Sequence, residues 1–280
     1  MCDKTPSSCL ALLNTAQSKH DVGSESWWEL EATRLTWLFE FHQEDELYAA
    51  LRPWINSTDV PSSYEPLISK LLGKWLVIRG RNDEAAQSFE LALEGYSKQY
   101  EAKPAQQTAL EVLNLLVALN RLAQAEAFVA GLVEYEYSDP AFYREVFAEL
   151  GHIAYRTDNY EKHVEYRLSS LEWAKQLDDK QQIGVAFNNY GVALRNIGKI
   201  AQAKEAFIQG LSLAISSSDA VRISILHLRL AEISHMQNDI AGAREWLSKA
   251  DLNHLPASEF KRLRELSTRV NATSMTQESN

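Results

Sequence analysis

The chain has 280 residues, of which 45% are hydrophobic and 24% are charged, proportions that are ordinary for a folded soluble protein. Its net charge of −10 disfavours nonspecific binding to nucleic acid and to anionic membrane surfaces. With seven prolines and eleven glycines, the chain is too poor in turn residues for an all-β fold.

Membrane and export signals are not expected either. The longest notable apolar run, residues 115–119, is far shorter than the ~20 residues that are needed to span a bilayer. The N-terminus has no basic region followed by an apolar stretch, as a secretory signal would have. We therefore expect a cytoplasmic protein without a membrane partner.

In chain order, residues 1–26 should form a polar tail and a short helix, with Ser24 or Ser26 as a helix cap. From residue 27 to residue 253 the apolar pattern is helical almost throughout. Pro256 restarts the chain into a last helix within residues 254–270, which should cover the exposed end of a stacked array. The polar residues 271–280 are expected to be disordered.

The helical region repeats itself with a period of about 40 residues. A small or apolar residue recurs on the first helix of each pair, at Leu35, Gly73, Leu113, Gly151, Gly191 and Ala231. Twelve residues later come Leu47, Ala85, Ala125, His163, Ala203 and Ala243, and four residues after these come Leu51, Phe89, Val129, Arg167, Phe207 and Leu247. Such spacing predicts helix pairs that cross closely at small residues.

This pattern resembles the tetratricopeptide repeat over roughly residues 27–250. The residues that carry the resemblance best are Leu72, Gly73, Ala85, Phe89 and Ala92, and again Tyr190, Gly191, Ala203 and Phe207. The family's usual period is about 34 residues, so these lengthened units look like the arrays of bacterial signalling and regulatory proteins. The resemblance implies an all-α, right-handed α-solenoid of about six helix pairs in tandem, with terminal capping helices.

The resemblance also implies a binding groove. In this family the first helix of each pair lines the concave face, and certain positions of that helix point inward. Carried over by register onto the fourth, fifth and sixth pairs, these positions become Glu149, His152, Tyr155, Arg156, Asn188, Asn189, Arg195, Asn196, Arg229 and Glu232. We expect these residues to form a ligand groove for a peptide or protein segment.

The adjacent asparagines are the most informative of these residues. Asparagine is a mediocre helix former, so Asn188 and Asn189 in the middle of a helix require an explanation. An asparagine amide can donate to and accept from a peptide backbone at once, and Arg195 and Arg229 are suited to grip a carboxylate. The alternative is that Asn189 only bonds a neighbouring helix, and the sequence leaves both interpretations open.

A subset of this family clamps the two carboxylates at the C-terminus of a chaperone. Asn189 and Arg229 match positions of that clamp, but Glu111, Glu145 and Glu149 stand where neutral or basic groups would be needed. An acidic chaperone tail is therefore not the expected ligand. The basic residues of the last helix, such as Lys261 and Arg262, are interpreted as a solvated capping face rather than as a nucleic-acid contact.

No pattern in the sequence predicts catalysis. The seven histidines contain no arrangement that would converge on a metal, and Gly73-Lys74 and Gly198-Lys199 lack the remainder of a phosphate-binding loop. We therefore expect that the protein is not an enzyme and that it binds no metal and no cofactor.

The leading functional hypothesis is a non-catalytic protein–protein interaction scaffold with its partner in the concave groove. One alternative is a sensory or regulatory module that controls a transcription factor, kinase or cyclase encoded elsewhere. Another alternative is a self-associating structural module, so a homo-oligomer also stays open.

Overall fold

The computed structural model describes residues 6–132 and 139–278. These described residues form fourteen α-helices and one short 3-10 helix, and they contain no strand. The chain divides into two compact units, residues 1–135 and residues 136–280. The fold class is therefore all-α, as predicted.

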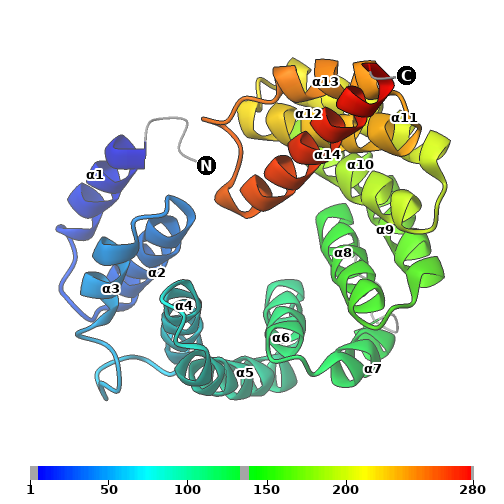
Figure 1. Cartoon of the computed structure of the whole chain (residues 1–280). Coiled ribbons are helices and arrows are strands. Elements are labelled where there is room, and N and C mark those ends of the chain that lie inside the picture. Colours follow the sequence, from blue (N-terminus) through cyan, green and yellow to red (C-terminus); the bar gives the residue numbers. More distant parts are fainter. Residues whose placement is uncertain (1–5, 133–138, 279–280) are drawn as a thin grey trace. The chain divides into compact units, whose positions relative to one another are not determined.

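Unit 1 consists of a first helix followed by three helix pairs (Figure 1). The helices are α1 (Pro6–Gln17), α2 (Glu25–Glu40), α3 (Glu44–Leu51), α4 (Glu65–Ile78), α5 (Asn82–Ala102), α6 (Gln106–Ala118) and α7 (Leu122–Leu132). Of the two cap candidates before α2, Ser24 is the one whose hydroxyl accepts a hydrogen bond, at 3.3 Å from the backbone nitrogen of Trp27.

Unit 2 consists of three further pairs and a terminal segment. Its elements are α8 (Pro140–Arg156), α9 (Tyr160–Ala174), α10 (Lys180–Asn196), α11 (Ile200–Ser216), α12 (Ala220–Met236), α13 (Ile240–Lys249), the 3-10 helix η1 (Ala257–Glu259) and α14 (Phe260–Glu278). Each unit therefore stacks antiparallel helix pairs in tandem, which is the α-solenoid architecture.

Small residues allow the two helices of a pair to cross closely, as the repeat pattern predicts. A Cβ atom added to Gly73 would lie 2.5 Å from the ring of Phe89, and one added to Gly191 would lie 2.6 Å from the ring of Phe207. Phe207 is fully buried. Only glycine fits at either crossing without a shift of the packed ring. The second and fifth helix pairs therefore pack through the same kind of contact, a glycine against a phenylalanine ring.

The turn inside each pair needs a residue in the left-handed conformation, which glycine and asparagine tolerate best. Gly80, Asn120, Gly198 and Asn238 occupy these turns with φ angles of 71°, 60°, 75° and 58°. In the fourth pair Asp158 takes this conformation, with φ of 56°. The turn residues that the repeat register indicates are thus the ones that reverse the chain.

Aromatic side chains build the core at the start of unit 1. Trp28 is 1% exposed, lies 4.9 Å from the ring of Trp54, and stacks on Tyr64 at 5.5 Å. Trp27 meets Trp28 edge to face at 5.2 Å. Ring pairs of this geometry add to the stabilisation that area burial provides, so these three tryptophans serve the core of unit 1.

The last helix covers the end of the unit 2 stack. Leu266 and Val270 are buried, and they share a core cluster with Ile225 and Leu228 of α12. Phe260, at the start of this helix, is 39% exposed and lies outside that cluster. The helix also continues to Glu278, beyond the expected end near residue 270. Residues 271–278 contain neither proline nor glycine to stop it.

Candidate functional site

The ten predicted groove residues lie on α8, α10 and α12, the first helices of the three pairs of unit 2. The structure places them in three groups with different surroundings: a group near the end of α8, the asparagine pair on α10, and a charged group that joins α10 to α12. Asn196 belongs to the third group, where its amide oxygen accepts a hydrogen bond from Arg195 at 3.4 Å.

The α8 group is mainly exposed. His152, Tyr155 and Arg156 are exposed, while Glu149 is half-buried. Burial raises the pKa of Glu149, the negative charge of Glu145 raises it further, and the positive charge of Arg167 opposes both. Burial, and then the positive charges of Arg156 and Arg167, lower the pKa of His152. The ionisable members of this group therefore lie beside the buried positive charge of Arg167, which acts on Glu149 and on His152.

The side chains of the asparagine pair are largely buried rather than open to solvent. Asn188 is only 6% exposed, and its side-chain nitrogen donates to the side-chain oxygen of Asn189 at 3.2 Å. The side-chain oxygen of Asn188 is buried without a hydrogen-bond partner among the described residues. The two amides thus bond each other, and Asn189 is the half-buried member that lies nearer to solvent.

The charged group is an ion-pair network, which we call the arginine cluster. Arg195 donates to Glu232 at 2.5 Å. Arg229 binds the carboxylate of Glu259 through both terminal nitrogens, at 2.6 and 3.1 Å. Arg262 lies 3.5 Å from Glu232 and 3.4 Å from Glu259. Three guanidinium groups and two carboxylates therefore link α10 and α12 to η1 and α14.

Burial makes the loss of one partner from this cluster more costly than in a surface network, because the other charge would be left unpaired away from water. The side chains of Arg195, Arg229, Glu232 and Glu259 are 17%, 8%, 15% and 16% exposed. Burial lowers the pKa of Arg195, and the positive charges of Arg229 and Arg262 lower it further, while Glu232 opposes them. The two predicted arginines are therefore bound to carboxylates of their own chain.

A cleft of about 560 Å³ opens beside the arginine cluster, and we call it the α14 cleft. Its walls come from α10, α12, η1 and α14. Its ionisable lining residues are Arg195, Glu232, His235, Lys261, Arg262, Glu265 and Arg269. The Nδ1 atom of His235 is buried without a hydrogen-bond partner among the described residues. This is a polar cleft in which basic side chains outnumber acidic ones.

Sequence reasoning missed the contribution of the terminal segment to this site. It assigned Lys261 and Arg262 to a solvated face, whereas Arg262 contacts the cluster and both residues line the α14 cleft. A signal was present, because residues 261, 262, 265 and 269 share one helical face. The repeat register could not show which face of the last helix meets α12, since that helix lies outside the period.

Within residues 6–132 and 139–278, no three histidine, cysteine, aspartate or glutamate side chains are grouped so as to hold a metal ion. In the same part of the chain, no helix combines the length and the apolar character needed to cross a bilayer.

The chain is similar to known proteins in structure but not in sequence. No protein-family model matches the chain, and no curated protein matches it in sequence. A chain from the APC/C hetero-tetramer Cut9-Hcn1 is similar with a TM-score of 0.65 at 16% identity, over 94% of this chain and 46% of the other, so the chain spans less than half of that protein.

Two structures of comparable length agree with this result. The apo form of RapI has a TM-score of 0.60 at 13% identity, covering 99% of this chain and 87% of RapI. A tetratricopeptide repeat protein from Parabacteroides merdae has a TM-score of 0.59 at 13% identity, covering 94% of this chain and 92% of the other. Together with the glycine crossings and the turn residues, these similarities show that the chain has the all-α solenoid fold of the tetratricopeptide-repeat proteins.

Proposed function

We propose that the chain is a non-catalytic protein-binding scaffold, and that unit 2 receives an acidic segment of a partner protein in the α14 cleft. The observation that carries this proposal is the sign of the local charge. The chain as a whole has a net charge of −10, but the cleft is lined by four basic residues and two carboxylates, apart from His235.

Three of these basic residues, Lys261, Arg262 and Arg269, are open to solvent. Lys261 is exposed, and the side chain of Arg262 is 41% exposed although it touches the cluster. A guanidinium group has five N–H donors, so Arg262 retains donors beyond those directed at Glu232 and Glu259. A partner's carboxylates would find charge-assisted hydrogen bonds along this wall.

The buried arginines have a different task in this proposal. Arg229 is 8% exposed and holds Glu259 with both terminal nitrogens, so its carboxylate site is already filled by the chain itself. Its pairing fixes η1 and the start of α14 against α12. Arg229 therefore positions the wall that carries Lys261 and Arg262, and it is not the residue that a ligand meets first.

The proposal requires complementary charge and shape, and it involves no covalent step. Opposite electrostatic potentials on the cleft and on its partner increase the rate of association and the selectivity among partners more than they increase the affinity. Binding should therefore be moderate and should weaken as salt screens the charges. Partner identity would reside in the acidic segment, which the cleft recognises by its carboxylates.

The test uses a fluorescein-labelled, glutamate-rich peptide and its glutamine twin, with binding followed by fluorescence anisotropy. The glutamate peptide should bind and the glutamine twin should not. The double variant Lys261→Glu with Arg269→Glu should weaken binding by at least about tenfold, because two attractions worth up to ~1 kcal/mol each are lost and repulsions of similar size replace them.

Arg264→Glu is the matched control, since Arg264 is an exposed arginine of the same helix that does not line the cleft. It changes the net charge of α14 without changing the cleft wall. If Arg264→Glu weakened binding as much per charge as the double variant, the cleft would not be the binding site.

A further inference from the structure

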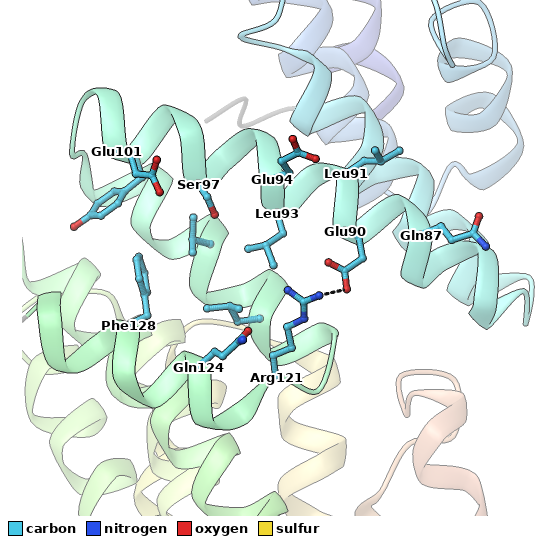
Figure 2. Close-up of a pocket in the computed structure, with 13 residues that line it drawn as sticks. Gln87, Glu90, Leu91, Leu93, Glu94, Ser97, Glu101, Arg121, Gln124 and Phe128 are labelled. Carbon is cyan, nitrogen blue, oxygen red and sulfur yellow. Dashed lines mark hydrogen bonds and ion pairs between the residues drawn. The ribbon is translucent and has the colours of Figure 1, made fainter.

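A second cavity belongs to unit 1, whereas the arginine cluster belongs to unit 2. Its volume is about 820 Å³, and its lining comes from α5, α6 and α7 (Figure 2). We call it the α5–α7 slot. The helix α4, which is the first helix of its pair, contributes no lining residue. The slot thus opens on the side of the second helices, whereas the predicted groove residues lie on first helices.

Two contacts between α5 and the α7 side bound the slot. At one end Arg121, just before α7, donates to Glu90 at 2.5 Å, as Figure 2 shows. At the other end the rings of Tyr100 and Phe128 meet edge to face at 5.4 Å. Arg121 and Phe128 are seven residues apart, or about 10 Å along a helix. The opening between these contacts is therefore too narrow for a docked helix but wide enough for large side chains.

The floor of the slot is apolar. Leu93, Val112 and Leu116 are 7%, 4% and 7% exposed and form the inner surface. At the mouth, Leu91 is 60% exposed, which is the highest value among the large apolar side chains of the described helices. An exposed leucine beside an apolar cavity is stabilised when a ligand covers both.

The rim is acidic. Three carboxylates, those of Glu90, Glu94 and Glu101, line the slot from α5, and Arg121 is the single basic residue of the lining. Glu90 is already paired with Arg121. Glu94 pairs with Lys98 on its own helix, but both side chains are well exposed, at 63% and 71%, so that pair is weak. The slot therefore presents an apolar interior behind a rim of net negative charge.

We propose that the α5–α7 slot binds a partner segment in which bulky apolar side chains alternate with lysine or arginine. The apolar side chains would enter between the two bounding contacts and cover Leu91, and the basic side chains would meet Glu94 and Glu101. Bulky anchors in a well-packed pocket, surrounded by a polar rim, are the usual source of binding energy at such sites. This site is distinct from the α14 cleft and selects the opposite charge.

The experiment uses a fluorescein-labelled peptide of alternating leucine or phenylalanine and lysine. One twin replaces its lysines with glutamate, and another replaces its apolar residues with serine. Fluorescence anisotropy should show binding of the first peptide alone. Absence of binding by the first peptide at about 1 mM, which corresponds to roughly −4 kcal/mol, would refute the proposal.

Two variants test the location. Ser97→Phe places a ring inside the slot, and Leu91→Ser removes the exposed apolar side chain; each should weaken binding at least about tenfold. Leu91 is largely exposed, so Leu91→Ser keeps the test valid if the ring of Ser97→Phe disturbs folding. Glu94→Gln with Glu101→Gln should weaken binding mainly at low salt.

The matched control is Ile78→Ser, which removes a 45% exposed apolar side chain of α4 that does not line the slot. It should leave the affinity unchanged. Equal weakening by Ile78→Ser and Leu91→Ser would overturn the proposal, as would full binding by a folded Ser97→Phe variant or by the glutamate twin. Loss of binding in the Lys261→Glu, Arg269→Glu protein would also overturn it, because that variant alters the other site.

Discussion

The substitution Glu259→Gln tests how the terminal segment is held. It removes the carboxylate that Arg229 binds through both terminal nitrogens at 2.6 and 3.1 Å. Both side chains are well below a third exposed, at 8% and 16%, so solvent screening reduces the pair's energy little. Breaking a buried ion pair by removing one partner costs about 3–5 kcal/mol.

The cost at this site should lie at or just below the lower end of that range. Glutamine can still accept one hydrogen bond, and Arg229 retains Glu232 at 3.8 Å. We therefore expect the docking of α14 to weaken by about 2–3 kcal/mol. That change would speed hydrogen exchange of the α14 amides by about 30- to 150-fold, since each 1.4 kcal/mol is a factor of ten.

Hydrogen exchange followed by mass spectrometry measures this effect segment by segment. Exchange in α5 should not change, because α5 belongs to unit 1. Glu265→Gln serves as the control, since it removes one negative charge from an exposed position of α14 for which no ion pair is found among the described residues. Equal acceleration by the two substitutions, or none by Glu259→Gln, would refute the anchoring role of Arg229.

Three further substitutions test the packing and the pH dependence of unit 2. Gly191→Ala should destabilise unit 2 by about 1–3 kcal/mol through overpacking, because the added Cβ would lie 2.6 Å from the ring of Phe207. Gly184→Ala should instead stabilise its helix by about 0.5–1 kcal/mol, because the added Cβ would have no contact closer than 3.6 Å. Urea denaturation measures the free energy of unfolding of each variant and distinguishes the two signs. Burial lowers the pKa of His163 despite the bond to the carbonyl oxygen of Gly151, so the folded state resists protonation and stability falls as the pH drops below about 6.5. Between pH 7.5 and pH 5, His163→Gln should lose less of its melting temperature than the unaltered chain; an equal loss would contradict this.

Much of the fold could be predicted from periodicity because each repeat makes the same local contacts. Gly73 against Phe89 and Gly191 against Phe207 are close crossings that only a small residue permits. The turn glycine Gly198 adopts a positive φ that the helix reversal requires. Such features depend on neighbours within one pair, and a sequence pattern records them directly.

The candidate site depends on contacts that have no period. Arg229 was identified by register, but its partner Glu259 lies thirty residues further on, across the link to η1. Register also indicates which face of a helix a residue occupies without indicating how deeply it is buried. Asn188 illustrates this limit, because it was placed in the groove and is only 6% exposed.

The central proposal is that the α14 cleft receives an acidic segment, and zero-length crosslinking tests it most directly. A carbodiimide joins a peptide carboxylate to a lysine amine only where the two are in contact. Lys261 is the one lysine that lines the cleft, so the glutamate-rich peptide should crosslink to Lys261, and mass spectrometry of the digest should locate the bond. A crosslink to other lysines with none at Lys261 would contradict the proposal.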